Sequence, residues 1–439
     1  MASVRWILAA AGPVRNLRYL ADLARWAVRT AAACRRRHRE TRPGVAVDVS
    51  PFWEPLTGIG WYLYRMLEEL AGRDDLVFRL YGPDLVHVPV QVPGTPGPLI
   101  EPPAGPALER VAHRLPPHRG AGLGLLVDRA ARLLAPALLA LDGNAVLFAP
   151  NYFPHRRFEI ALALGTPLVA TVHDLSYRKV PWAVRPETLD ELGRHLDFVW
   201  IRAALVLTDA EAVRREILEA GLTSPERVRA IHLAPAHAGL VEESGPGTLP
   251  SGVPEGAGLF VGTVEPRKNL ETLLEAWRRL RERPGLRGGA PPPLVVCGRI
   301  GWAGRDLLRE LERARREGWL VHLDYVADRE LASLYRSARV VALPSWYEGF
   351  ALPALEACAA GAPVVASDLP VLREVLGEAA RFAPPDRPDR WVRELGRVLD
   401  DETLRAELAL RGRARAGHFD WTRTARATAE ALLEVAEWA

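Results

Sequence analysis

The chain has 439 residues, of which 49% are hydrophobic and 25% charged, and its formal net charge is +3. These values fit a soluble globular protein, and no apolar stretch approaches the ~20 residues that a bilayer-spanning helix needs. The cysteines, Cys34, Cys297 and Cys358, are far apart, which argues against a disulfide framework or a zinc site and fits a reducing compartment. Because this length exceeds one ordinary core, we expect two domains.

Residues 1–42 form a basic leader that carries ten arginines against two acidic residues. Trp6, Tyr19 and Trp26 lie among these arginines, a pattern typical of a surface helix on an anionic membrane. An equally good interpretation is a solvated helix packed on the first domain. The leader does not resemble a secretory signal peptide, because its apolar run is short and arginines follow it.

Residues 43–240 predict a first doubly wound domain, because apolar strand-like runs alternate with helical patterns. The glycine loop TGIG at 57–60 follows the first strand, and Gly58 and Gly60 let the backbone approach a ligand closely. The proline-rich stretch 83–119 is expected to be a long loop with little regular structure. The predicted strands are 45–50, 76–82, 145–150, 167–174, 204–210 and 228–235.

Residues 241–257 are rich in Gly, Pro, Ser and Glu and predict an interdomain linker. Residues 258–420 predict a second doubly wound domain, and a last helix over 421–439 is expected to cross back and pack on the first domain. The expected fold is therefore α/β, with two parallel sheets and a cleft in which ligands bind at the carboxyl ends of the strands. The predicted strands of the second domain are 258–264, 293–298, 320–326, 339–345 and 363–367.

His173 ends the predicted strand at 167–174. A histidine at the end of a strand in a cleft is placed to donate to a substrate hydroxyl or to stabilise charge. A lone histidine is more often structural, so this pattern alone does not decide between the two roles.

The segment GTVEPRKN, residues 262–269, follows the first strand of the second domain and opens a helix, with Asn269 as its expected N-cap. Arg267 and Lys268 suit a diphosphate, because arginine supplies a fork of donors and lysine a compact point charge. Each charge-assisted hydrogen bond contributes ~1.5–3 kcal/mol. Lysine is rare here, with two among 57 basic residues, which favours a function over a solvated pair of surface charges.

The stretch PSWYEGFALPALEACAAGAPVVAS, residues 344–367, carries Glu348 and Glu356 on either side of a loop-to-helix junction. Pro353 suits the first helical turn, and Gly361 is placed to end the helix. The start of such a helix presents free N–H groups and the positive end of the helix dipole, which together form an anion site. Two carboxylates around an anion site indicate a site for a phosphorylated sugar nucleotide.

CGRIGWAG, residues 297–304, reads as a strand end, a glycine turn and Trp302. Arg299 is a candidate contact for a phosphate or a base, and the alternative is a turn with a packing tryptophan. The sequence has no Asp-x-Asp motif, no His/Cys cluster with metal spacing, no P-loop and no nucleophile elbow. The missing GxGxxG fingerprint weighs against a dehydrogenase.

The sequence resembles the retaining glycosyltransferases of family 4, the glycosyl transferases group 1. The motifs that carry the resemblance are, in chain order, GIGWYL, TVHDL, GTVEPRKN, CGRIGW, the long segment 325–367 and FDW. The resemblance covers nearly all of the chain from about residue 45. GIGWYL and GRIGW are most similar to the mannosyltransferase branch. The resemblance implies a GT-B fold of two Rossmann-like domains, with the acceptor site mostly in the first and the sugar-nucleotide donor mostly in the second.

By this likeness Arg267 and Lys268 hold the donor diphosphate, and Gly58 and Gly60 bring the first domain's loop against it. The family needs no bound metal, because cations and helix dipoles neutralise the leaving group. The missing Asp-x-Asp motif agrees with that expectation.

The same likeness places Glu348 beside the transferred sugar as an electrostatic and positioning group, and His173 at the catalytic face of that sugar. Glu356 binds the ribose hydroxyls. The family often has glycine where this chain has alanine at 351. Further donor contacts are expected from Gly262, Arg299 and the backbone near Phe350, Ala351 and Leu352.

We therefore expect a bacterial, metal-independent, retaining hexosyltransferase of polysaccharide biosynthesis. It is expected to move a sugar from a nucleotide-sugar donor, GDP-mannose first, to a polysaccharide or lipid-linked acceptor. The nucleotide sugar is a substrate, and neither a cofactor nor a nucleic-acid partner is expected. The expected location is the cytoplasm, with the leader 1–42 peripheral on the inner face of the plasma membrane.

Other interpretations stay open at this point. UDP- and dTDP-sugars are alternative donors, and the sequence names neither the acceptor, the linkage nor the oligomeric state. A GT-B nucleotide-sugar epimerase or phosphorylase would share the fold. A non-catalytic, membrane-associated partner subunit is a third alternative, although the four charged residues Arg267, Lys268, Glu348 and Glu356 argue against a degenerate site.

Overall fold

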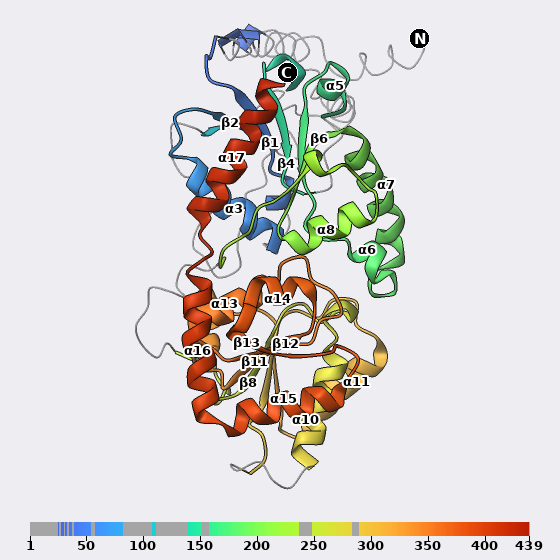
Figure 1. Ribbon diagram of the computed structural model, residues 1–439, viewed down its shortest axis with the longest axis vertical. Helices are drawn as coiled ribbons and strands as arrows, with labels where there is room; N and C mark the ends of the chain where they lie inside the picture. Colours follow the sequence, from blue (N-terminus) through green and yellow to red (C-terminus); the bar gives the residue numbers. More distant parts are fainter. Residues whose placement is uncertain are drawn as a thin grey trace, which may run out of the picture. The chain divides into compact units, whose positions relative to one another are not determined.

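The computed structural model describes residues 39–53, 58–81, 108–110, 139–151, 158–236, 248–282 and 289–438, and single residues or pairs within 25–36. Most of the predicted leader 1–42, most of the stretch 83–119 and residues 241–247 of the predicted linker lie outside this description. The chain divides into a first unit, Met1–Thr171, Phe198–Val206 and Ala425–Ala439, and a second unit, Val172–Asp197 and Leu207–Thr424 (Figure 1).

Among the described residues, the first sheet has seven strands in the order β3-β2-β1-β4-β5-β6-β7. Its pairings from β3 across to β5 are parallel, and the first six strands follow the doubly wound Rossmann order. Strands β1, β2 and β4 are buried along their whole length, as expected of apolar strands covered on both faces. The strands are β1 (Gly44–Asp48), β2 (Val77–Tyr81), β3 (Leu108–Arg110), β4 (Val146–Ala149), β5 (Leu168–Thr171), β6 (Ala203–Thr208) and β7 (Val228–Ala230).

The second sheet has six strands in the order β10-β9-β8-β11-β12-β13, and every neighbouring pair is parallel. This is the same Rossmann order. The α/β fold with two doubly wound sheets is therefore confirmed. The strands are β8 (Gly258–Val261), β9 (Leu294–Cys297), β10 (Leu320–Leu323), β11 (Val340–Leu343), β12 (Val364–Ser367) and β13 (Ala380–Ala383).

Two strands differ from the sequence prediction. Strand β3 lies inside the stretch 83–119, where the sequence predicted a long loop and no strand, and it pairs with β2 in parallel. Strand β13 (Ala380–Ala383) completes the second sheet beside β12, although its sequence ARFA is too short and polar to predict a buried strand.

The helices alternate with the strands along the chain, and α10 packs against α15 and α13 against α16 in the second unit (Figure 1). Short 3-10 helices are η1 (Ser50–Trp53), η2 (Pro181–Ala183), η3 (Pro225–Arg227), η4 (Pro266–Lys268) and η5 (Gly377–Ala379). The α-helices are α3 (Gly58–Leu70), α5 (Phe158–Ala163), α6 (Ser176–Lys179), α7 (Pro186–Arg202), α8 (Glu211–Glu219), α10 (Leu270–Glu282), α11 (Arg305–Arg316), α12 (Asp328–Ser337), α13 (Leu352–Ala360), α14 (Pro370–Leu376), α15 (Pro388–Asp400), α16 (Glu402–Ala416) and α17 (Trp421–Glu437).

The core of the second unit explains one of its glycines. Helix α10 buries Leu273, Leu274, Trp277 and Leu280, whose spacing of three to four residues places them on one apolar face of the helix. A Cβ atom at Gly258, at the start of β8, would lie 2.1 Å from the Trp277 indole. Only glycine therefore lets this tryptophan pack directly against the first strand of the sheet.

Candidate active site

The candidate site lies where the winding of the second sheet reverses. Residues 262–268 follow β8 and residues 344–348 follow β11, and these two strands are neighbours although they are not consecutive in the chain. Ligands of doubly wound sheets bind at this reversal, outside the carboxyl ends of the strands. The two segments are joined directly, because the Trp346 N–H donates to the Arg267 carbonyl at 2.9 Å.

Glu348 is the centre of a buried charged cluster. The Lys268 ammonium donates to its Oε1 at 2.7 Å, Arg267 Nη1 to its Oε2 at 3.1 Å, and the Ser345 hydroxyl to Oε1 at 2.6 Å. Its side chain is only 5% exposed. Burial acts to raise the pKa of Glu348, but the charges of Lys268 and Arg267 prevail and lower it to about 2. The carboxylate is therefore ionised at neutral pH and is not a general acid.

Arg267 is held from two sides. Its Nη2 lies 2.8 Å from Glu265 Oε1, and its Nη1 donates to the Tyr347 carbonyl at 3.1 Å as well as to Glu348. Burial acts to lower the pKa of Arg267, and the two carboxylates outweigh it and raise that pKa above its usual range. The guanidinium is thus a fixed positive charge. Glu265 was not singled out from the sequence, although it lies within the predicted segment.

Asn269 directly precedes α10, at the position of the predicted N-cap, and its side-chain nitrogen links two segments of the site. Its backbone is left-handed, with φ 54° and ψ 41°, and its side-chain amide donates to the carbonyls of Pro344 and Pro385 at 2.9 and 2.8 Å. The amide therefore ties the segment after β8 to the segment after β11. A short amide side chain that tolerates the left-handed region suits this position.

Gly262 and Gly298 end neighbouring strands and touch each other. Their φ values are 148° and 149°, and a Cβ atom at Gly298 would lie 2.1 Å from the Gly262 carbonyl oxygen. The Lys268 stem passes close to Gly262, 3.6 Å from the place that a Cβ would occupy. Arg299 follows Gly298 and is exposed, and its carbonyl accepts the Val264 N–H at 2.9 Å.

Helix α13 begins and ends where the sequence predicted. Pro353 lies in its first turn, and Gly361 ends it in the left-handed conformation, with φ 75°. Ala351 precedes the helix at φ 67° and ψ 63°, a left-handed conformation that is costly for a residue with a Cβ atom. This conformation gives a physical reason for the glycine that the resembled family often has there.

Phe350 turns its side chain away from the charged cluster. The ring is buried and packs against His232 and Phe419, with centroid separations of 6.1 and 5.8 Å. Its candidate contact with a donor is therefore through the backbone, as it is for its neighbours Ala351 and Leu352.

Glu356 is buried inside α13 and accepts a hydrogen bond from the Tyr335 hydroxyl at 3.0 Å. Tyr335 lies on α12, and burial together with the Glu356 carboxylate raises its pKa well above the usual range. Tyr335 therefore stays a neutral donor and fixes the direction of the carboxylate. The sequence gave no signal for this partner, because an isolated tyrosine on a helix is most often a packing residue.

His173 lies in the second unit, beside the turn that carries Glu348. Its Nδ1 is 2.7 Å from Asp209 Oδ2, and both side chains are largely buried. A carboxylate at this distance favours the tautomer with the proton on Nδ1 and fixes the ring. A Cβ atom at Gly349 would lie 2.0 Å from the His173 carbonyl oxygen, so a glycine is required at 349. This glycine therefore makes room for the His173 backbone.

The Tyr347 side chain links the segments that surround His173. The Tyr347 hydroxyl donates to Glu216 Oε2 at 2.8 Å and accepts the Leu175 N–H at 3.1 Å. Burial and the nearby carboxylates raise the pKa of Tyr347. These contacts hold the residue next to Glu348 in place.

Glu374 links α14 to the start of α8 and to His232. Its two oxygens accept the N–H groups of Glu211 and Ala212, which begin α8, at 2.7 Å each, and its Oε1 lies 2.6 Å from His232 Nε2. Burial acts to raise the pKa of Glu374, and these hydrogen bonds outweigh it and lower it. A carboxylate at a helix N-terminus is favoured by the helix dipole.

Gly58 and Gly60 belong to the first unit. The structure begins α3 at Gly58, so the expectation that both glycines lie in a loop is wrong, and Gly60 is buried within the helix. Their predicted contact with the diphosphate stays a prediction. Within the residues that the structure describes, no group of three His, Cys, Asp or Glu side chains is arranged to hold a metal ion.

Known proteins resemble this chain along most of its length. A family model described as glycosyl transferases group 1 matches residues 255–415. The O-antigen chain mannosyltransferase B of Escherichia coli is 31% identical over 387 residues, which cover 84% of this chain and 94% of that protein. Sucrose-phosphate synthase from Thermosynechococcus elongatus is similar in structure, with a TM-score of 0.66 at 20% identity, over 91% of this chain and 100% of that chain. The Anabaena protein HepE, solved in complex with UDP and glucose, has a TM-score of 0.62 at 18% identity, over 90% and 100% of the two chains.

The chain belongs to the group 1 glycosyltransferases, because it shares this level of identity with a family member over nearly the whole length of both proteins. The family that the sequence resembled is thereby confirmed. The solved structures show the fold alone, and that fold is GT-B. The protein is a glycosyltransferase with mannosyltransferase relatives.

Proposed function

We propose that this enzyme transfers a sugar, mannose in the first instance, from a nucleotide-sugar donor to a glycan or lipid-linked acceptor, with retention of the anomeric configuration. The observation that carries the proposal is the buried cluster of Arg267, Lys268 and Glu348 at the reversal of the second sheet. Phosphate-bearing nucleotides bind at such reversals in doubly wound folds. The similarity to an O-antigen mannosyltransferase supports mannose as the sugar and a polysaccharide as the acceptor.

The diphosphate of the donor is proposed to bind the two cations. The Lys268 ammonium has three donors and the Arg267 guanidinium has five, so each has donors beyond those that it gives to Glu348. Charge-assisted donors that are already fixed in place stabilise the leaving nucleoside diphosphate without reorganising during the reaction. We propose that they do so in place of a metal ion, together with backbone N–H groups at the start of α13.

The sugar is proposed to lie beside Glu348 and His173. In the transfer step the bond from the anomeric carbon to the donor phosphate breaks, and the acceptor hydroxyl oxygen bonds to that carbon on the same face. The acceptor's proton moves to the leaving phosphate oxygen. The ionised Glu348 carboxylate stabilises the positive charge that develops on the sugar, and His173, held by Asp209, contacts a sugar hydroxyl.

Glu356 is proposed to bind the ribose hydroxyls of the donor. A carboxylate is a hydrogen-bond acceptor, as the hydroxyl groups of a ribose require, and the Tyr335 hydroxyl fixes its direction. Gly262 and Arg299 stay predicted neighbours of the donor, as do Gly58 and Gly60.

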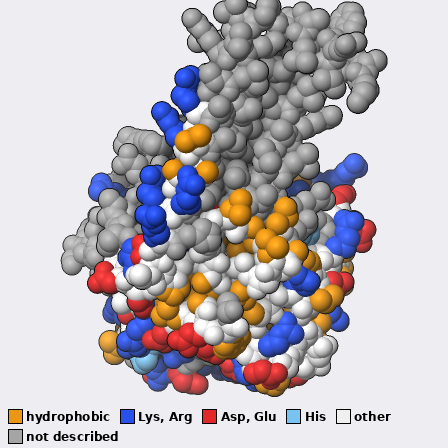
Figure 2. All heavy atoms as spheres, turned by 90° about the horizontal axis from the view of Figure 1, so that it is seen from above, with side chains coloured by type: hydrophobic (Ala, Val, Ile, Leu, Met, Phe, Trp, Pro, Cys, Tyr) orange, Lys and Arg blue, Asp and Glu red, His pale blue; other side chains and the backbone are white. Residues whose placement is uncertain are grey.

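The enzyme is proposed to work in the cytoplasm at a membrane surface. None of the described helices is long and apolar enough to cross a bilayer. Figure 2 shows one face of the described surface, on which hydrophobic side chains lie among both basic and acidic ones. The proposal therefore rests on the sequence of the leader 1–42, whose arginines and aromatic residues suit an anionic lipid surface. Co-sedimentation with phosphatidylglycerol vesicles tests it, with phosphatidylcholine vesicles as the control.

A donor screen tests the proposed function. GDP, UDP and dTDP are titrated into the protein by calorimetry, and the matching nucleotide sugars are then supplied with acceptor. We expect one nucleoside diphosphate to bind, and proton NMR of the product to show the anomeric configuration of the donor. Absence of binding for every nucleoside diphosphate would refute the proposal, and an inverted product would refute retention alone.

A further inference from the structure

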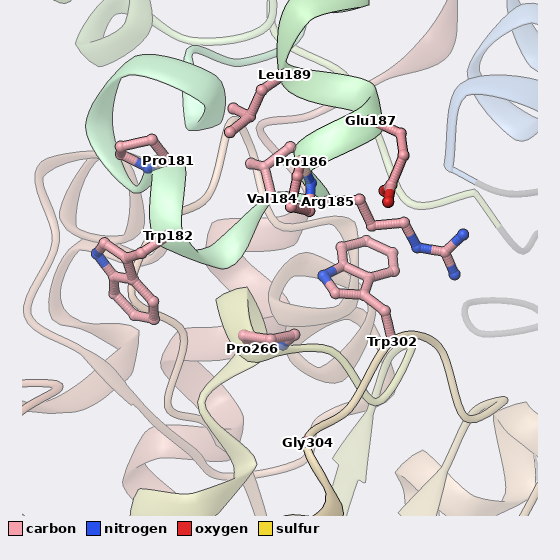
Figure 3. Close-up of a pocket in the computed structure, with 10 residues that line it drawn as sticks. All are labelled: Pro181, Trp182, Val184, Arg185, Pro186, Glu187, Leu189, Pro266, Trp302 and Gly304. Atoms are coloured by element: carbon pink, nitrogen blue, oxygen red, sulfur yellow. The ribbon is translucent and has the colours of Figure 1, made fainter.

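A pocket of about 980 Å³ lies in the second unit, beside the charged cluster. One wall comes from η2 and the start of α7, with Trp182, Arg185 and Glu187, and the other from the segments after β8 and β9, with Pro266 and Trp302. Figure 3 shows the two indole rings on opposite sides of the pocket in this view, with Pro266 between them. This volume is within the range of pockets that hold small molecules.

Direct contacts link the walls of the pocket to the candidate active site. Pro266 directly precedes Arg267, which holds Glu348. The Trp182 ring meets the Trp346 ring edge-on, with centroids 5.5 Å apart. The Trp346 N–H in turn donates to the Arg267 carbonyl. The wall of the pocket and the charged cluster are therefore built from neighbouring residues of the same segments.

The walls combine flat apolar rings with hydrogen-bonding charges. Trp182 is 61% exposed, unusually open for a tryptophan on a folded protein. The Arg185 guanidinium covers the Trp302 ring, 4.8 Å from its centroid, and the Trp302 N–H donates to the Ala183 carbonyl at 3.3 Å. In the view of Figure 3 the side chains of Arg185 and Glu187 reach toward the Trp302 ring of the opposite wall.

This chemistry fits a carbohydrate better than the other components of the reaction. A sugar ring has an apolar C–H face for an indole and an edge of hydroxyl groups that both accept from Arg185 and donate to Glu187. A prenyl chain would use the two indole rings but would give neither Arg185 nor Glu187 a hydrogen-bond partner, whereas sugar hydroxyl groups serve both. A second phosphate group would be repelled by the Glu187 carboxylate.

We propose that this pocket binds sugar residues of the acceptor glycan beyond the one that is glycosylated, with Trp182 and Trp302 as stacking platforms. The inference rests on the proposed function for the identity of its ligand, and it adds a preference for oligosaccharide over monosaccharide acceptors.

The test measures direct binding of α-linked mannotetraose and of methyl α-mannoside by ligand-observed NMR, and of GDP by calorimetry. Variants are Trp182→Ala and Trp302→Ala, with Trp182→Phe to restore a flat ring. Trp438→Ala is the matched control, because that tryptophan is also exposed, at 54%, and belongs to the first unit. We expect mannotetraose to bind about ten-fold more weakly to Trp182→Ala and Trp302→Ala. Trp182→Phe and Trp438→Ala should bind it as the parent does, and GDP affinity should be unchanged in all of them.

The outcomes separate the two proposals. The pocket proposal is overturned if the parent binds mannotetraose no more tightly than methyl α-mannoside. It is also overturned if both alanine variants keep full affinity for mannotetraose. In either case the proposed function stands as long as the parent binds GDP. If mannotetraose binding depends on the tryptophans but no nucleoside diphosphate binds, the proposed function fails and the pocket remains a glycan site. Binding of a short prenyl phosphate that both tryptophan variants abolish, without an effect on mannotetraose, would also overturn the glycan assignment.

Discussion

Glu348→Gln tests whether the charged cluster stabilises the second unit as its geometry indicates. The pKa of Glu348 is lowered from 4.5 to about 2, and each pH unit of that difference corresponds to about 1.4 kcal/mol. The ionised carboxylate therefore contributes about 3 kcal/mol to folding at pH 7. This agrees with the ~3–5 kcal/mol lost when one partner of a buried ion pair is removed.

The pH dependence has a defined sign. Because the pKa is lower in the folded protein than in the unfolded chain, the contribution is complete above about pH 4.5 and is lost as the pH falls toward about 2. The difference in unfolding free energy between the parent and Glu348→Gln is therefore expected to be about 3 kcal/mol at pH 7. At pH 3 it should have fallen to roughly half or less.

The assay is urea unfolding of both proteins from pH 7 to pH 3, followed by tryptophan fluorescence. Ser345→Ala is the matched control, because it removes one hydrogen bond to the same carboxylate and keeps the charge. Ser345→Ala is expected to lower the unfolding free energy by ~1.5–3 kcal/mol and to keep most of the pH dependence of the parent. An unfolding free energy of Glu348→Gln within about 0.5 kcal/mol of the parent at pH 7 would refute the reasoning.

Substitutions at Lys268, Gly349 and Ala351 test neighbouring parts of the site. Lys268→Ala should weaken GDP binding by roughly 10- to 100-fold in calorimetry, because one charge-assisted hydrogen bond is lost. The control Lys179→Ala should leave the GDP affinity unchanged. If Lys268→Ala binds GDP as tightly as the parent does, Lys268 is not part of the donor site. Gly349→Ala should lower the unfolding free energy by ~1–3 kcal/mol, because its Cβ would meet the His173 carbonyl, whereas Gly193→Ala on α7 has open space and should be neutral or stabilising. The unfolding free energy of Ala351→Gly should stay within about 0.5 kcal/mol of the parent, because relief of the left-handed backbone is offset by a lost buried methyl group and a more flexible unfolded chain. Ala351→Val should lower the unfolding free energy by about 2 kcal/mol. Both are measured by urea unfolding, and an Ala351→Val protein as stable as the parent would contradict the strain at residue 351.

The parts of the fold that follow from local pattern could be predicted. The apolar runs located nearly all strands of both sheets, and Pro353 and Gly361 located the two ends of α13, because these signals depend on residues close together in sequence. Strand β3 could not be predicted, since three residues carry too little periodicity to distinguish a strand from a loop. Gly58 was misplaced for a similar reason, because a glycine before an apolar helix is equally compatible with a loop and with a first helical turn.

The partners within the site depend on distant residues. Adjacency in the sequence suggested that Arg267 and Lys268 act together, but not that both would donate to a carboxylate about eighty residues away. Asp209 beside His173, and Tyr335 beside Glu356, are likewise joined only by the fold. A sequence identifies which groups have the required chemistry, whereas the sheet order decides which of them meet.

The charges of the cluster constrain how a donor is held. Arg267 and Lys268 face Glu265 and Glu348, so two partly buried cations are balanced by two buried carboxylates. The net charge of these four side chains is zero, and a diphosphate would gain little from their summed field. Its binding would depend on the direction of fixed donors, and on the N–H groups at the start of α13, where the helix dipole favours an anion. Because fixed donors act over short distances, we infer that the site favours a diphosphate whose oxygens match their geometry over other anions of the same charge.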